Sequence, residues 1–291
     1  MIANQAGNSN YFAAPQVTKT TTATKATQTI SFSTPPPATA GYESVFTVVA
    51  TATSGLTVLF NSSGVCTNSG ATYTITSPTG ICVVIAAQPG NGNYSAATEQ
   101  TPQLNATKGT PIITWNPAAI TYGTPLGNGQ LDATATNGTG ATVPGSFKYN
   151  PATGKILVAG TQALSATFTP SSTTDYNTVT PTASLQVNPD STITSVTSSD
   201  QTVTLKNGTA TATIDFNVTT AYKPAGSVTV TASTGENCSG TVSSSTGNGS
   251  CKLTFSTAGT RTVNASYAGD ANHTGSNSDS QNPQITVTVN Q

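Results

Sequence analysis

The feature that most constrains the fold of this chain is an internal repeat of about 83 residues. The segment IANQAGNSNYFAA at 2–14 returns as IAAQPGNGNYSAA at 85–97, an offset of 83. Residues 30–32 return at the same offset, so two separate matches share one register. Looser copies of the first segment follow at 168–176 and 267–273. A period this short is the size of one small domain, and the sequence therefore predicts a tandem array.

The repeat also predicts domain boundaries. Residues 1–27 match only the last strands of a unit, and complete units follow at 28–108, 109–189 and 190–291. We therefore expect Met1 to be an artificial or miscalled start inside a longer array. If the chain begins there, the leading hairpin should expose unpaired strand edges.

Within each unit the pattern is that of β-strands. Residues 72–76, 163–168, 211–218 and 285–289 alternate apolar and polar positions with period two and are rich in β-branched and aromatic residues. No segment combines a helical period with caps. About seven short strands in 83 residues is the size of an immunoglobulin-like sandwich. The predicted fold class is all-β, with tandem immunoglobulin-like β-sandwiches.

Two Asn-Gly pairs predict tight turns between strands. Lys206-Asn207-Gly208 joins two alternating runs, and Asn248-Gly249 lies shortly before Cys251. Asn-Gly is the preferred pair for a type I′ hairpin, because both central residues need a positive φ. We expect a hairpin at each position.

The middle unit resembles a known family. Ile113-Thr-Trp115, Tyr122-Gly123 and Phe168-Thr-Pro followed by Asp175-Tyr176 are similar to the YGX type of MBG module of large bacterial surface proteins. Unit 28–108 resembles a relative that has Ala40-Gly41 where Tyr-Gly is expected. The last unit is similar to bacterial Ig-like repeat domains, because of its two cysteines and the residues 258–272. The resemblance implies a sandwich fold and a surface context.

The four cysteines form two close pairs, Cys66 with Cys82 and Cys238 with Cys251, each inside one predicted unit. Two disulfides are the economical interpretation, and four unrelated buried thiols are the alternative. Spacings of 16 and 13 residues do not match the close ligand pairs of a zinc site. Paired cysteines favour an oxidising compartment, so the predicted location is extracellular or at the cell surface.

Charge is scarce and excludes several partner classes. Only 7% of residues are charged, the net charge is −1, and Ser and Thr together make up 91 of 291 residues. Without a basic cluster there is no electrostatic surface for nucleic acid. The longest apolar run, residues 81–87, is far shorter than the roughly twenty residues of a spanning helix, so we expect no membrane insertion.

The residues needed for catalysis are also scarce, and we expect no catalytic, cofactor-binding or metal site. His273 is the one histidine and is expected in a solvated loop or at a sandwich end. Strand parity places Asp132 and Asp215 on outward faces, which argues against a paired-carboxylate hydrolase. Asp270-Ala-Asn272 offers too few oxygen ligands for calcium.

A tyrosine recurs at the same place in the repeats, as Tyr11, Tyr94 and Tyr176. Each follows a strand by a turn, where a ring can cap the open end of a sandwich with its hydroxyl in water. A sugar-binding platform is the alternative interpretation.

The sequence thus favours a non-enzymatic stalk or spacer of a bacterial surface or adhesin-like protein, with neighbouring Ig-like domains of the same or adjacent chains as partners. A second hypothesis is a filament subunit, a homopolymer joined by strand addition through residues 1–27. A third is a carbohydrate-binding module with a glycan ligand at Tyr94 or Tyr176.

Overall fold

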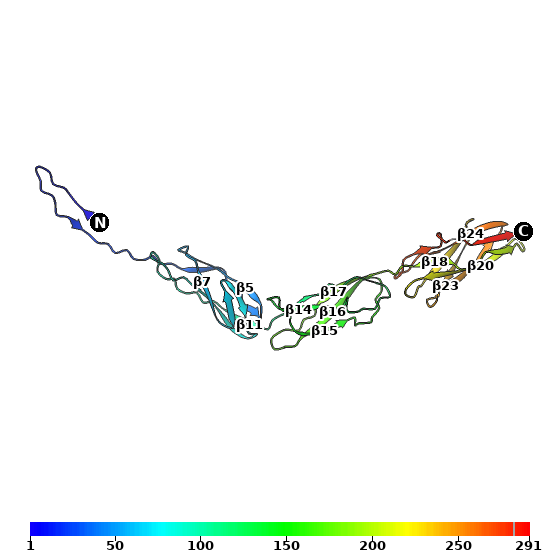
Figure 1. Ribbon diagram of the computed structural model, residues 1–291, viewed down its shortest axis with the longest axis horizontal. Helices are drawn as coiled ribbons and strands as arrows, with labels where there is room; N and C mark the ends of the chain where they lie inside the picture. Colours follow the sequence, from blue (N-terminus) through cyan, green and yellow to red (C-terminus); the bar gives the residue numbers. More distant parts are fainter. Residues whose placement is uncertain (282) are drawn as a thin grey trace. The chain divides into compact units, whose positions relative to one another are not determined.

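The computed structural model describes residues 1–281 and 283–291, and its regular elements are all β-strands (Figure 1). The predicted all-β class is confirmed. Within these described ranges, no helix has the length and apolar character needed to cross a membrane.

The chain divides into two compact units. The first comprises Met1–Ile112, Ala135–Gly145 and Thr169–Thr178, and the second comprises Ile113–Thr134, Ser146–Phe168 and Val179–Gln291. Residues 109–189 contribute to both units, so the domain boundaries taken from the repeat remain a prediction.

The first unit begins with an isolated hairpin, in which β1 (Ile2–Ala3) pairs antiparallel with β2 (Val17–Thr18). Its apolar side chains are open to solvent: Tyr11 is 73% exposed and Phe12 is fully exposed. The hairpin has the pairing of a sandwich edge but no second sheet over it.

The rest of this unit is a sandwich. One sheet has the order β4 (Thr39–Gly41), β11 (Gln103–Thr107), β10 (Gly80–Ala87) and β7 (Leu59–Gly64). Another has the order β5 (Val45–Thr47), β9 (Thr72–Ile75) and β8 (Cys66–Ser69), and β3 (Ile30–Thr34) pairs with β6 (Val49–Ala52). Tyr73, Ile75 and Val84 are fully buried between the sheets, because successive side chains of β9 and β10 point to opposite faces and these three face the core.

The second unit holds two cores. The first lies on the sheet β13 (Ile120–Thr121), β17 (Thr182–Asn188), β16 (Gly160–Pro170) and β15 (Gly145–Asn150), near the short strands β12 (Ile112–Thr114) and β14 (Thr134–Thr136). Leu164, Leu185 and Trp115 belong to this core.

The second core lies between two further sheets. One has the order β18 (Ile193–Val196), β20 (Ala210–Thr219) and β23 (Asn248–Phe255). The other has the order β19 (Gln201–Thr204), β26 (Thr286–Asn290), β24 (Gly259–Tyr267), β21 (Ser227–Ala232) and β22 (Asn237–Thr241), with β25 (Ser276–Asn277) paired to β24.

One topological feature recurs three times. An early strand pairs parallel with the last strand of its repeat in β4–β11, β13–β17 and β19–β26, whereas the neighbouring pairs are antiparallel. This recurrence is the structural form of the sequence repeat, and it identifies the array as tandem immunoglobulin-like sandwiches.

Strand β20 shows how the sequence pattern selects the core. Its residues alternate strictly between buried and outward positions, with Ile214 and Phe216 fully buried and Asp215 exposed between them. On the neighbouring strand β23, Lys252 is exposed beside buried Leu253. The predicted outward orientation of Asp215 is confirmed, and Asp132 is also exposed.

Of the two predicted Asn-Gly turns, one forms and one does not. Lys206 and Thr209 exchange backbone hydrogen bonds, and Asn207 and Gly208 have φ of 53° and 81°, as a type I′ turn requires. The prediction at Asn248-Gly249 is wrong, because both residues lie in β23. The turn is placed earlier, at Gly247, whose φ is +74°.

Both disulfides connect one sheet of a sandwich to the other. Cys66 on β8 is bonded to Cys82 on β10, and Cys238 on β22 is bonded to Cys251 on β23. They close loops of 16 and 13 residues. Loop-closure entropy gives each a stabilisation of about 3 kcal/mol.

The core of 190–291 provides a first test. Leu253→Ala should lower the free energy of unfolding of this region by about 2–5 kcal/mol, because it removes a fully buried side chain and leaves a cavity. Lys252→Ala on the same strand should change it by no more than about 0.5 kcal/mol. Native-state hydrogen exchange of amides 190–281 measures both, and equal losses would contradict the observed strand parity.

Candidate functional site

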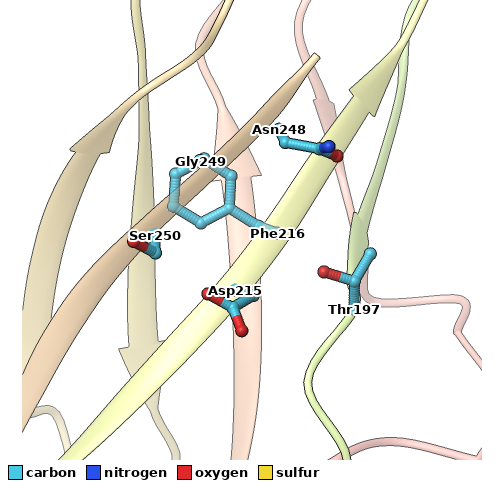
Figure 2. Close-up of a pocket in the computed structure, with 6 residues that line it drawn as sticks. All are labelled: Thr197, Asp215, Phe216, Asn248, Gly249 and Ser250. Carbon is cyan, nitrogen blue, oxygen red and sulfur yellow. The ribbon is translucent and has the colours of Figure 1, made fainter. Parts of the chain in front are cut away.

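A hollow of about 440 Å³ lies on the sheet of β20 and β23 (Figure 2). Its lining residues are Thr197, Asp215, Phe216, Asn248, Gly249 and Ser250. Asp215 is the one ionisable group among them, so the hollow holds no carboxylate pair. Phe216 is fully buried and offers no open ring for stacking. The hollow therefore combines one exposed carboxylate with the hydroxyls of Thr197 and Ser250.

Of the two positions expected for His273, the solvated loop is wrong, and a place at a sandwich end stays a prediction. His273 is only 3% exposed. Its Nδ1 lies 2.9 Å from both carboxylate oxygens of Asp270, and its Nε2 lies 2.5 Å from the carbonyl oxygen of Tyr222. Burial follows from this double attachment, which the loop sequence alone does not reveal. Both ring nitrogens lie within hydrogen-bond distance of protein oxygens, so neither is free to contact a substrate.

The Asp270 carboxylate is fully engaged by proton donors. It accepts from the backbone N–H of Asn272 at 2.7 Å, from the Tyr267 hydroxyl at 3.0 Å and from His273. Burial raises the pKa of Asp270, but these hydrogen bonds outweigh it and the pKa lies below the ordinary value. Among the described residues, no cluster of three or more His, Cys, Asp or Glu could hold a metal ion.

A shared turn explains why the repeats match in sequence. Three segments read Gly-Asx-x-Asn-aromatic, at 7–11, 90–94 and 269–273. The Asx side chain accepts from the backbone N–H two residues on in each, at 2.9, 2.8 and 2.7 Å. Glycine precedes it because a Cβ at Gly90 would lie 2.4 Å from the carbonyl oxygen of Tyr94. The motif therefore encodes a turn that fixes the aromatic residue.

The repeat aromatics Tyr94, Tyr176 and His273 are each tied to a residue at or just before the start of their own repeat. Short parallel bridges connect Ala26 with Tyr94, Gly109 with Tyr176, and Asp190 with His273. In each, the early residue donates its N–H at 2.8 Å and accepts through its carbonyl at 2.8–2.9 Å. The segment that leads into each repeat is thus fixed by two backbone hydrogen bonds.

A second tyrosine follows the parallel strand pair. The Tyr42 N–H donates to the Thr107 carbonyl at 2.8 Å, and the Tyr122 N–H donates to the Asn188 carbonyl at 2.8 Å. Tyr42 and Tyr122 are therefore equivalent. The prediction that Ala40-Gly41 stands in place of the Tyr-Gly pair is wrong. The strand register shows that Tyr42-Glu43, two residues later, is equivalent to Tyr122-Gly123.

The residue after each tyrosine, Glu43 or Gly123, has a different side chain but the same left-handed backbone conformation. Glu43 has φ of 56° and Gly123 has φ of 90°. Glycine adopts this left-handed region without strain, whereas a glutamate there needs support from its surroundings. Glu43 receives that support from its side-chain contacts.

The first junction consists of Tyr42, Glu43, Asn137 and Tyr176, all in the first unit. The rings of Tyr42 and Tyr176 meet edge to face with centroids 5.4 Å apart. The Tyr176 hydroxyl and the Asn137 amide both donate to the Glu43 carboxylate. Gly109 is required here, since a Cβ would lie 2.6 Å from the Tyr42 carbonyl oxygen.

These contacts shift the ionisation of both partners. The hydrogen bond from Tyr176 is the main reason that the pKa of Glu43 is lowered, although burial acts in the opposite direction and Asn137 adds a further lowering. Burial, followed by the bond to Glu43, raises the pKa of Tyr176 to about 12. The junction therefore holds a carboxylate and a neutral phenol throughout the physiological range.

The second junction consists of Tyr122, Gly123, Tyr222 and His273, all in the second unit. The Tyr122 ring meets Tyr222 at 5.3 Å and His273 at 5.2 Å, both edge to face. A Cβ at Gly123 would lie 2.5 Å from the Cβ of Tyr222. Gly123 therefore leaves space for Tyr222. At the first junction the equivalent residue is Glu43, which supplies a carboxylate.

The three predicted capping tyrosines differ in how far their side chains are buried. Tyr176 is buried at 9% exposure, with its hydroxyl on Glu43 and not in water, which leaves little open ring for a sugar. Tyr94 is half-buried. The expectation of a buried ring is wrong for Tyr11, because its hairpin pairs only with itself.

The sequence reasoning missed the partners of these residues: Tyr42, Glu43, Asn137, Asp190 and Tyr222. The detectable signal was the Gly-Asx-x-Asn-aromatic motif at 269–273, which marks the His273 side of the second junction; Tyr176 at the first junction lacks this motif. The other side follows a parallel strand and becomes visible only when the strand register is known.

Comparisons with known proteins do not assign this chain to a family. No family model matches the chain, and no curated protein matches it. Among solved structures, Drosophila N-cadherin EC1-4 matches with 10% identity over 91% of this chain and 76% of that chain, at a TM-score of 0.33. Domains 1–6 of the surface layer protein SbsC match with 15% identity over 99% of this chain and 44% of that one, at 0.29. Fibronectin(III)-like modules of Clostridium thermocellum CbhA match with 14% identity over 62% and 95%, at 0.27. None of these scores reaches 0.5, so the fold assignment rests on the strand pairing of this chain.

The first junction makes a pH-dependent prediction. Because the folded pKa of Glu43 is lowered, its stabilisation is complete above the ordinary glutamate pKa of about 4.3 and is lost as pH falls through the lower folded value. Glu43→Gln should cost about 1 kcal/mol at pH 7, a value reduced for partial exposure, and should flatten this acid loss. Hydrogen exchange of amides 135–145 and 169–178 measures the effect.

Glu99→Gln is the matched control, because Glu99 is exposed in the same unit. It should leave exchange in these segments unchanged. An acid dependence that persists undiminished in the Glu43→Gln variant would show that another group is responsible.

Proposed function

We propose that this chain is a non-enzymatic extracellular spacer, a stalk segment of a bacterial surface or adhesin-like protein. The observation that carries the proposal is the pair of junctions, in which buried hydrogen bonds and edge-to-face rings attach one repeat to the residues of the next. Each junction contains a buried polar side chain, Asn137 at the first and His273 at the second.

Several further features support an extracellular mechanical role. Each disulfide joins the two sheets of a sandwich, and disulfides persist in oxidising compartments. The low charge and high Ser and Thr content give an outer surface with few sites for nonspecific electrostatic attachment. The resemblance of 109–189 to the YGX type of MBG module supports a bacterial surface setting.

The mechanism would be resistance to extension. Cross-strand hydrogen bonds hold each sandwich, the two-bond bridges at Gly109 and Asp190 fix the linkers, and the disulfides shorten the chain that an unfolding repeat can release. A spacer with these properties keeps its domains in series under load.

Pulling the chain from its two ends with a force probe tests this function. Discrete unfolding steps are expected, one for each sandwich. Reduction should lengthen two of the steps by about 50 Å and about 40 Å, because 16 and 13 residues extend at up to about 3.6 Å each and replace Cα–Cα separations of 5.3 and 5.8 Å across the bonds. Extension without discrete steps at low force would contradict a spacer role.

A second candidate function is self-assembly through residues 1–27. The β1–β2 pairing of Ala3 with Val17 repeats the bridge between Ala86 and Gln100, yet Ala86 is fully buried and Ala3 is exposed. The hairpin thus has the register of a sandwich hairpin and no sandwich around it. A second copy of the chain is the partner that this hypothesis requires.

Deletion of residues 1–27 separates the two functions. A filament subunit would lose assembly in sedimentation at high concentration, whereas a spacer would keep the same mass per particle with and without the segment. The variant Phe12→Ser, which removes a fully exposed apolar ring, should reduce assembly in the same direction without a deletion.

A further inference from the structure

The chain has one histidine, and both of its ring nitrogens face groups that only accept hydrogen bonds. Nδ1 faces the two oxygens of Asp270 at 2.9 Å, and Nε2 faces the carbonyl oxygen of Tyr222 at 2.5 Å. A neutral imidazole carries one N–H, and the doubly protonated ring carries two. Only the cation can donate to both partners.

The neighbours do not offer another solution. A backbone carbonyl has no proton to donate, and the pKa of Asp270 is lowered, so Asp270 is a carboxylate at neutral pH. The ring is 3% exposed, which leaves no room for solvent to replace a lost partner. Either neutral tautomer would therefore place a nitrogen lone pair against an oxygen that can only accept, an arrangement that costs free energy.

We propose that His273 is held as an imidazolium cation in the folded chain, where it positions the 220–223 loop against the Tyr122 turn and makes the second junction dependent on pH. The regulatory meaning rests on the proposed spacer function, whereas the protonation of His273 does not. His273 acts here as a positioning residue.

The 220–223 loop is held from two sides by ionisable groups. The Asp190 carboxylate accepts from the N–H groups of Ala221 at 2.9 Å and Tyr222 at 3.2 Å. His273 donates to the Tyr222 carbonyl from the other side. The ring of Tyr222 then meets Tyr122 at 5.3 Å. Loss of the His273 proton removes one of the two attachments that place this ring.

Four ionisable groups around the junction, Asp190, Asp270, Tyr122 and Tyr267, have pKa values shifted away from neutral pH and keep their ionisation state there. Hydrogen bonds keep the pKa of Asp190 and Asp270 below the ordinary value, although burial raises both. Burial raises the pKa of Tyr122 and, with the bond to Asp270, that of Tyr267 to about 12. The remaining groups that face the loop are the Tyr222 phenol and Lys223, whose Nζ lies 5.4 Å from the Tyr222 ring centroid.

The sign of the effect follows from linkage. Because the folded chain keeps the His273 proton at pH values where the unfolded chain has lost it, the stabilisation is complete below the ordinary histidine pKa of about 6.5 and is lost as pH rises and the folded ring deprotonates. The second junction therefore weakens on the alkaline side, whereas the first weakens on the acid side through Glu43.

Nitrogen-15 NMR of the histidine ring in the intact chain tests the protonation directly. One histidine gives one pair of ring nitrogen signals, and no assignment is needed. At pH 7 both nitrogens should show the protonated signature. In Asp270→Asn the cation should be lost at a lower pH, because an amide can donate to one ring nitrogen. Asp215→Asn, on an exposed face of the same repeat, is the control and should leave the signals unchanged.

A second measurement tests the positioning role. Once His273 deprotonates, exchange protection of the Ala221 and Tyr222 amides should fall by about tenfold or more beyond the intrinsic effect of pH, as the loss of a charged hydrogen bond implies. A neutral tautomer at pH 7 in the folded chain would overturn the proposal. So would unchanged protection of these amides across the deprotonation. Neither result would alter the unfolding steps under force, which test the spacer function separately.

Discussion

The contact on which the rest of this array depends is the short backbone bridge between the first residue of a repeat and its aromatic turn. Gly109 and Asp190 each give one N–H and one carbonyl to the strand-like backbone around Tyr176 and His273. Buried backbone groups must be paired, and these four hydrogen bonds pair them at the point where the chain passes from one sandwich to the next. With these two linkers fixed, Tyr176 meets Tyr42 and His273 meets Tyr122, each a tyrosine that follows a parallel strand.

The two junctions solve the same packing problem with different chemistry. At the first, Glu43 takes a left-handed backbone and its carboxylate gathers the Tyr176 hydroxyl and the Asn137 amide. At the second, Gly123 leaves space that Tyr222 fills, and the charge is moved to the Asp270–His273 pair. A chain with only 7% charged residues thus places several of its few ionisable groups at the contacts between repeats.

The sequence predicts the local structure well and the contacts between distant segments poorly. Period-two alternation correctly places Ile214 and Phe216 inside and Asp215 outside, because neighbours on a strand must face opposite sides of the sheet. The turn at Asn248-Gly249 is misplaced because Gly247 takes the positive φ, and composition does not show which of two glycines bends the chain. His273 is misjudged for a similar reason: its burial depends on Asp270 and on Tyr222, which lies 51 residues away.

By itself, the sequence determines the all-β class and the positions of the core faces, because strand propensity, alternation and the Gly-Asx-x-Asn-aromatic turn act over a few residues. The recurrence of that turn also determines that the chain is an array. Only the tertiary structure decides what each turn meets. Glu43 and Tyr176 are 133 residues apart, and no local rule brings a carboxylate to that hydroxyl. Their meeting depends on strand register and on the course of the linker, which are set by the burial of whole sheets and not by the residues that finally touch.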